Sequence, residues 1–175
     1  MNPADTLSRP EATRKPMSET TTPTVMLVDD EEMVTTALAG FLQLETHYRV
    51  LQFNSPREAL EVVDRETVDV VVADFMMPEM DGVDFLKAVR TRRPHSTRIL
   101  LTGYADVENA IRAINEAGLY QYLQKPWDNE QLKIVIRNGI ERSSLVNELD
   151  ARISALEHAN SELHGIRQRL IQAFL

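Results

Sequence analysis

The sequence contains no cysteine among its 175 residues, which excludes disulfide bonds, thiolate metal sites and cysteine nucleophiles. It also lacks any apolar run close to the roughly 20 residues that a membrane-spanning helix needs, and this predicts a cytoplasmic protein without a membrane segment. Positive charge is outnumbered, with 19 lysines and arginines against 27 aspartates and glutamates. The formal net charge of -8 disfavours nonspecific attraction to nucleic acid or anionic membranes, so we expect a protein partner and no direct binding of nucleic acid.

The length and the hydrophobic content of 43% allow one domain of ordinary size with a tail or an appended helix. Residues 1–23 are rich in proline, serine and threonine and lack the apolar centre of a secretory signal, so they are expected to form a disordered tail. We expect the domain itself to span residues 24–140, and residues 141–175 to continue its last helix.

Five short apolar segments alternate with helical patterns from residue 24 onward, as expected for an α/β fold with helices on both faces of a parallel sheet. The strands are expected at 25–28, 48–53, 68–73, 98–101 and 120–123. The second and fifth interleave polar residues and should be edge strands, whereas the others are apolar enough to be buried on two faces. This pattern favours the flavodoxin-like, doubly wound order 2-1-3-4-5. Helices are expected at 31–44, 56–65, 81–92 and 106–117, with a last one that includes residues 132–140.

Leucines recur every seven residues in the C-terminal segment and predict a coiled coil. The d positions are Leu149, Leu156, Leu163 and Leu170, and the a positions are Val146, Ile153, Asn160 and Arg167. We expect a parallel homodimer through residues 146–170, in which Asn160 could set the register and Arg152 could face Glu157 of a partner helix. The alternative is a single amphipathic helix that folds back on its own domain.

Acidic and other polar residues end the expected strands. Asp29 and Asp30 end the first, Asp74 the third, Thr102 the fourth and Lys125 the fifth. In a parallel sheet these ends lie at one edge. Three carboxylates gathered there would repel one another, so the arrangement favours a hard divalent ion, with Mg²⁺ as the natural candidate.

A carboxylate beside a metal ion and an ammonium group can accept a phosphoryl group, because that transition state needs positioning and electrostatic stabilisation. Lys125 would supply the ammonium group, and the Thr102 hydroxyl would donate a hydrogen bond to a phosphoryl oxygen.

Four motifs together resemble those of response regulator receiver domains, over roughly residues 24–140. They are Val28-Asp29-Asp30, Asp74 to Gly82 with Pro78 between them, Leu101-Thr102-Gly103, and Lys125-Pro126-Trp127. The resemblance implies that Asp74 accepts the phosphoryl group from a histidine kinase or a phosphotransfer protein. It also implies metal ligation by Asp29, Asp30, Asp74 and the backbone carbonyl of Met76, a cis peptide bond before Pro126, and a switch role for Tyr122 together with Thr102.

Other features of the sequence are interpreted as structural. Asp81 and Gly82 are expected to form a turn and a helix start. Three methionines near Asp74 are expected to serve packing and the loop, and the histidines are expected at the surface. The methionines are Met76, Met77 and Met80, and the histidines are His47, His95, His158 and His164.

Two other functions are compatible with parts of this pattern. A haloacid-dehalogenase-like phosphatase also uses an aspartyl phosphate, Mg²⁺, a threonine and a lysine, but its nucleophile lies on the first strand and is followed two residues later by another aspartate. Here the second neighbour of Asp74 is Met76. The other possibility is a phosphate sink whose helical segment serves only to dimerise. The sequence leaves open whether the output is the coiled coil or an effector domain of a longer regulator, and whether phosphorylation activates or inhibits it.

Overall fold

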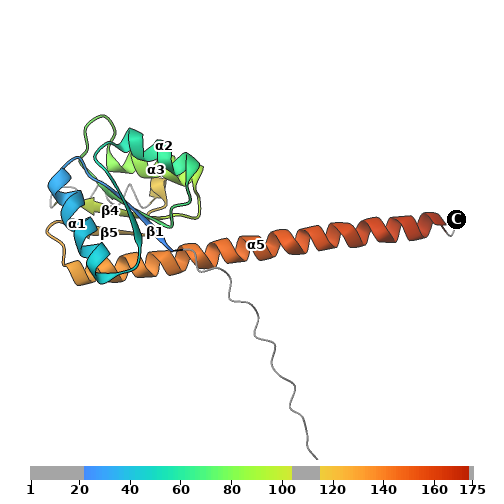
Figure 1. Ribbon diagram of the computed structural model, residues 1–175. Coiled ribbons are helices and arrows are strands. Elements are labelled where there is room, and N and C mark those ends of the chain that lie inside the picture. The colour runs from blue at the N-terminus through green and yellow to red at the C-terminus, as the bar shows by residue number, and fades with distance from the viewer. Residues whose placement is uncertain (1–21, 104–114, 174–175) are drawn as a thin grey trace, which may run out of the picture.

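Five parallel strands form one sheet in the order β2-β1-β3-β4-β5, as the sequence predicts (Figure 1). The computed structural model describes residues 22–103 and 115–173. The strands are β1 (Thr24–Val28), β2 (Arg49–Phe53), β3 (Val70–Asp74), β4 (Thr97–Thr102) and β5 (Gln121–Gln124). The helices are α1 (Glu32–Glu45), α2 (Pro56–Arg65), α3 (Gly82–Arg92) and α5 (Asn129–Ala173). The protein therefore has the expected flavodoxin-like α/β fold.

Helices cover both faces of the sheet, as Figure 1 shows. Alternate residues of the central strands point to opposite faces, so Met26 and Val28 pack with α2 and α3 while Val25 and Leu27 pack with α1 and α5. Every residue of β1, β3 and β4 is buried, whereas β2 and β5 are only partly buried. The predicted edge strands are thus confirmed.

The strand boundaries differ from the sequence-based ones by one or two residues. The largest difference is at β3, which begins at Val70 although Val68 was expected to start it. Val68 is buried in the preceding loop, and the next residue, Asp69, accepts a hydrogen bond from the backbone N–H of Thr24 through its side chain (2.8 Å). Val68 is therefore apolar because it is buried in the hydrophobic core with α2 and α3, and not because it pairs with a neighbouring strand.

The helix expected at 106–117 falls largely outside the described residues; its last three, 115–117, are helical. This end is held by Arg98 of β4, whose guanidinium group is buried. It donates hydrogen bonds to the carbonyl oxygens of Ser96 (2.6 Å), Ala117 (2.9 Å) and Gly118 (3.0 Å). Burial lowers the pKa of Arg98 to about 10, and repulsion from other arginines adds to this, so the side chain stays charged at neutral pH.

α5 is a single helix of 45 residues, about 68 Å long, and it projects far beyond the domain in Figure 1. The alternative of a helix folded back on its own domain is therefore wrong. Contacts between α5 and the domain extend past Gly139 to Asp150. Thr97 donates a side-chain hydrogen bond to the carbonyl of Gly139 (2.7 Å), and the ring of His95 lies 2.8 Å from a carboxylate oxygen of Asp150. His95 is thus half-buried between a loop and α5, more enclosed than the surface position expected for it.

Among the residues that the structure describes, no helix combines the length and the apolar character needed to cross a membrane.

Candidate functional site

Three aspartates meet at the carboxyl edge of the sheet. Asp74 is the last residue of β3, and Asp29 and Asp30 follow β1, the strand beside it. One carboxylate oxygen from each lies within 4.8 Å of the others, with Asp29 and Asp74 buried and Asp30 exposed. The sequence-based expectation that these residues come together is met because parallel strands end on one side.

Lys125 links two of the carboxylates. Its ammonium group lies 2.6 Å from Oδ1 of Asp74 and 3.1 Å from Oδ2 of Asp29. The residue directly follows β5, and the peptide bond to Pro126 is cis, as the resemblance implied. β5 is separated from β3 by β4, and the long side chain of Lys125 brings an ammonium group from this edge strand to the aspartates.

Backbone groups orient the same carboxylates. The N–H of Met76 donates to Oδ2 of Asp74 (3.1 Å), and the N–H of Glu31 donates to Oδ1 of Asp29 (2.9 Å). Both buried aspartates therefore bond one oxygen to a backbone donor and the other to Lys125, and neither side chain can rotate without losing two hydrogen bonds. This arrangement fixes the carboxylates before any ligand arrives.

The electrostatics of the cluster favour an additional cation. Burial raises the pKa of Asp74 above its usual range, the hydrogen bond and charge of Lys125 oppose this, and repulsion from Asp29 adds to it. Burial alone would lower the pKa of Lys125, but its hydrogen bonds to Asp74 and Asp29 outweigh this and raise it. One ammonium group thus stands against three carboxylates, and this excess of negative charge would be relieved by a divalent ion.

The donor set fits Mg²⁺. All three side chains offer carboxylate oxygens, which are hard ligands, and Mg²⁺ in proteins is usually held by a few carboxylates together with water. A hollow of about 740 Å³ opens above the cluster and leaves room for water and a phosphoryl group. It is lined by Asp30, Glu31, Asp74, Phe75, Met76, Met77, Pro78, Asp81, Gly103 and Lys125.

The two residues expected to act as a switch differ in their surroundings. Thr102, at the end of β4, is buried, and its hydroxyl donates to the carbonyl of Gly103 (3.2 Å). Tyr122 on β5 is 40% exposed. The hydroxyl of Thr102 is therefore bonded to its own loop, while Tyr122 is partly exposed to solvent.

The loop after Asp74 combines exposed and buried residues. Met77 is buried in the hydrophobic core and Met80 packs against that core, as expected for packing residues. Met76, by contrast, is 67% exposed at the rim of the hollow. Asp81 caps α3 by accepting a hydrogen bond from the backbone N–H of Asp84 (2.8 Å). The expected turn and helix start at Asp81 and Gly82 is confirmed.

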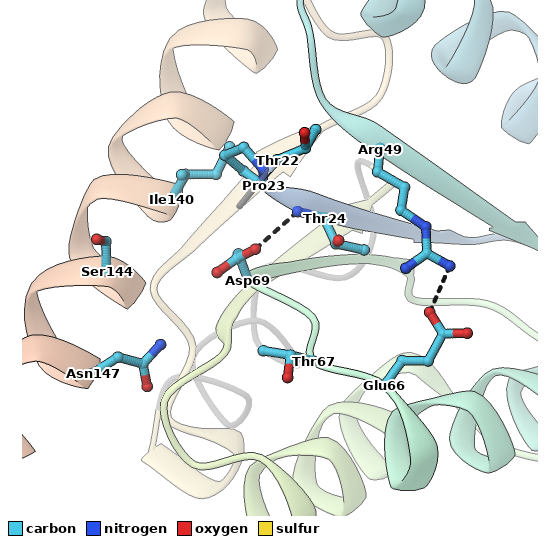
Figure 2. Close-up of a pocket in the computed structure, with 10 residues that line it drawn as sticks. All are labelled: Thr22, Pro23, Thr24, Arg49, Glu66, Thr67, Asp69, Ile140, Ser144 and Asn147. Carbon is cyan, nitrogen blue, oxygen red and sulfur yellow. Dashed lines mark hydrogen bonds and ion pairs between the residues drawn. The ribbon is translucent and has the colours of Figure 1, made fainter. Parts of the chain in front are cut away.

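A second hollow, of about 750 Å³, lies at the other edge of the sheet, beside α5 (Figure 2). Its charged groups are already bonded within the protein: Arg49 forms an ion pair with Glu66 (2.6 Å), and Asp69 accepts from the N–H of Thr24. It contains none of the motif residues. We therefore place the chemistry at the aspartate cluster and not at this hollow.

Sequence reasoning missed Asn54, the residue directly after β2. Its side-chain amide donates to the carbonyl of Asp29 (2.8 Å) and to the hydroxyl of Thr35 (3.2 Å). Its place after a strand next to β1 was visible in the sequence, but an exposed asparagine at a strand end is usually a turn residue. Only the hydrogen bonds single it out.

A parallel sheet of this order, with two aspartates after β1, an aspartate at the end of β3 and a lysine after β5, has the architecture of a receiver domain. Residues 25–137 match the response regulator receiver domain family, and the chain belongs to this family. It therefore contains the receiver domain of a two-component response regulator.

The chain is similar to several transcriptional regulators. It is 41% identical over 126 residues to the hydrogenase transcriptional regulatory protein HoxA of Cupriavidus necator, an alignment that covers 72% of this chain and 26% of that protein. It is 36% identical over 131 residues to the regulatory protein AtoC of Escherichia coli, covering 71% and 27%. The chain thus spans about a quarter of the length of these relatives.

Solved structures give the same picture. The signal receiver domain of an HD domain-containing protein from Pseudomonas fluorescens aligns with a TM-score of 0.71 and 32% identity, covering 75% of this chain and 96% of that one. The beryllofluoride-activated NtrC4 receiver domain dimer aligns with a TM-score of 0.64 and 33% identity, covering 69% and 98%.

Proposed function

We propose that this chain is a phosphorylation switch, in which Asp74 accepts a phosphoryl group from a phosphohistidine of a kinase or a phosphotransfer protein in the cytoplasm. The observation that carries the proposal is the buried carboxylate of Asp74, 2.6 Å from Lys125 and within 4.8 Å of oxygens of Asp29 and Asp30. A nucleophile, a cation and a set of metal ligands stand together at one edge of the sheet.

In the proposed step, a carboxylate oxygen of Asp74 attacks phosphorus, the bond from phosphorus to the imidazole nitrogen breaks, and the imidazole leaves with that electron pair. Lys125 is placed to bind a phosphoryl oxygen, since its ammonium group already contacts the acceptor. Mg²⁺ held by Asp29, Asp30, Asp74 and the backbone carbonyl of Met76 would offset the negative charge of the incoming group. The protein's share is positioning and electrostatic stabilisation, so we expect one transfer per chain and no multiple-turnover reaction.

Metal removal tests this proposal directly. With acetyl phosphate as donor and Mg²⁺ present, we expect incorporation of one phosphoryl group per chain. With all divalent metal chelated, incorporation should fall at least 100-fold, because the three carboxylates would then repel the donor. Mass spectrometry of the intact protein gives the stoichiometry. Equal labelling with and without metal would contradict the proposal.

After phosphorylation, Thr102 is proposed to leave the carbonyl of Gly103 and donate to a phosphoryl oxygen, with the ring of Tyr122 moving inward behind it. The change would alter the face that includes β5 and α5. Because α5 runs without interruption from the domain into the heptad segment, a shift of its first half would be felt along its whole length. We propose that the signal leaves through this helix.

The exposed stripe on α5 supports a dimer. Its leucine and isoleucine side chains are 44% to 70% exposed, and the helix that bears them projects beyond the domain. They are Leu149, Ile153, Leu156, Leu163 and Leu170. Such a stripe at heptad spacing would be buried by a second copy of the same helix. We propose a parallel homodimer through residues 146–170 that delivers the signal itself or passes it to an effector domain of a longer regulator.

We expect Leu156→Glu to convert the dimer to a monomer. Two buried leucines would be replaced by two facing carboxylates, at a cost of several kcal/mol per dimer. Sedimentation velocity measures the change. Ala155→Glu adds the same charge at an exposed c position and should leave the dimer intact. A Leu156→Glu protein that sediments like the wild type would refute the proposed dimer interface through residues 146–170.

A phosphate sink remains the second candidate. The long exposed stripe favours a relay over a sink, because a sink has no need to couple its α5 to the site. If phosphorylation of Asp74 left sedimentation and helix packing unchanged, the sink would become the better description.

A further inference from the structure

Asn54 lies directly after β2, beside the loop of Asp29, Asp30 and Glu31 that follows β1. The ladder between β1 and β2 ends at the pair of Val28 and Phe53, so Asp29 and Asn54 are the first residues beyond it. The backbone N–H of Asp29 still bonds to the carbonyl of Phe53 (3.2 Å). The carbonyl of Asp29 accepts a hydrogen bond from the side-chain amide of Asn54 (2.8 Å). This amide therefore adds one more hydrogen bond beyond the paired residues of β1 and β2.

The same amide also ties the loop to α1. Its second N–H donates to the hydroxyl of Thr35 (3.2 Å), which is buried on α1 and itself donates to the carbonyl of Glu32 (3.0 Å). The loop between β1 and α1 contains only Asp29, Asp30 and Glu31. Asn54 therefore holds this three-residue loop at its start and, through Thr35, at the first turn of the helix that follows.

The bond to the carbonyl of Asp29 has a consequence for Asp30. That carbonyl belongs to the planar peptide unit between the two aspartates, so the hydrogen bond from Asn54 restricts the movement of the whole unit, including the N–H of Asp30. Asp30 is exposed, and its Cα atom directly follows this peptide, so the peptide sets the position from which the carboxylate reaches the cluster. Restricting the peptide therefore restricts where the Asp30 side chain begins relative to Asp29 and Asp74.

We propose that Asn54 is a positioning residue for the Mg²⁺ site, which it preorganises by locking the peptide between Asp29 and Asp30. This inference rests on the proposed function in so far as that function requires Mg²⁺. Outer groups that orient metal ligands commonly contribute a factor of 10 to 100 to metal affinity. Asn54 acts through the backbone and not on a ligating atom, so we expect the lower end of that range.

The test compares Asn54→Leu with the wild-type chain by calorimetric titration with Mg²⁺. Leucine has nearly the shape of asparagine but cannot donate, and position 54 is exposed, so the fold should persist. We expect the Kd for Mg²⁺ to rise about tenfold. Gln52→Leu, a matched change at an exposed position two residues earlier on β2, should leave the Kd unchanged.

Labelling by acetyl phosphate supplies a second readout. In Asn54→Leu it should be slower than in the wild type at low Mg²⁺ and should match the wild type at saturating Mg²⁺, which a general loss of structure would not produce. An unchanged Kd, or slow labelling that saturating Mg²⁺ does not restore, would overturn the inference. If the wild type binds Mg²⁺ but takes no label, the proposed function fails while the role of Asn54 is still judged by the two Kd values.

Discussion

Asp74→Asn should abolish labelling by acetyl phosphate. The amide has the same shape as the carboxylate, but its oxygen is a far weaker nucleophile and it carries no charge to bind the metal ion. Asp74 lines the hollow, and its carboxylate is the one that lies 2.6 Å from the ammonium group of Lys125. We expect incorporation to fall at least 100-fold, measured as the fraction of intact chains that gain one phosphoryl group.

The matched control is Asp64→Asn. Asp64 lies on the surface of α2 and forms an ion pair with Arg92 (3.1 Å). Surface ion pairs contribute about 0–1 kcal/mol to the free energy of unfolding. The variant should be labelled like the wild type. Thermal melting of both proteins shows whether each is folded.

The same experiment separates the receiver from the haloacid-dehalogenase-like alternative. That reading places the nucleophile on the first strand, which here would be Asp29. Label that survives Asp74→Asn and disappears in Asp29→Asn, together with steady turnover of a simple phosphate monoester, would support the phosphatase and refute our proposal. In a receiver, Asp29→Asn should instead weaken Mg²⁺ binding and leave the label on Asp74.

Gly82→Ala should destabilise the protein strongly. A Cβ atom at this position would lie 2.1 Å from the carbonyl oxygen of Asp74 and 2.9 Å from a methyl carbon of Leu100. The backbone N–H of Gly82 also donates to the carbonyl of Phe75 (2.9 Å), so the chain cannot move away without losing this bond. We expect a loss of about 3 kcal/mol or more in the free energy of unfolding, and a melting temperature lower by about 10 °C.

Gly40→Ala is the natural comparison. Gly40 lies within α1, and a Cβ atom there would have no heavy atom within 4 Å. Alanine in a helix interior is preferred over glycine by roughly 0.5–1 kcal/mol, so this variant should be slightly more stable than the wild type. Denaturant titrations of the three proteins give the values. Melting curves in which Gly82→Ala matches the wild type would contradict the close approach of α3 to Asp74.

The Gly82 clash links stability to function. The carbonyl that would be displaced belongs to the proposed phosphoacceptor, and the residue that displaces it is the first of α3. Close packing of this helix against the end of β3 therefore helps to hold Asp74 in place. The sequence indicated a turn at Asp81 and Gly82, but it could not indicate that glycine is required there for lack of space.

Much of the fold followed from short-range patterns. Continuous apolar runs marked β1, β3 and β4, and interleaved polar residues marked β2 and β5 as edges. The strand order then follows from the general rules of parallel sheets, and it brings Asp29, Asp30, Asp74 and Lys125 to one edge. Heptad spacing alone indicated that the last helix continues past the domain.

Other features depended on contacts between residues distant in sequence. Arg98 looked like a polar residue at the start of a strand, yet its guanidinium group is buried and donates to four carbonyls from the segments on either side, those of Pro94, Ser96, Ala117 and Gly118. His95 looked like an isolated surface histidine, yet it meets Asn147 and Asp150 of α5. A hydropathy pattern cannot show such partners, since it reports the burial of a segment and not the direction of a side chain.

The sequence by itself determined which polar side chains end the strands and at which edge of the sheet they gather, because strand ends and motif spacing are local properties of the chain. The tertiary structure alone decided how they are held: Lys125 between two carboxylates, Asn54 on the carbonyl of Asp29, and Gly82 against the carbonyl of Asp74. These contacts join positions 25 to 96 residues apart, or depend on the close approach of two backbones, and only the packed fold brings such groups within hydrogen-bonding distance.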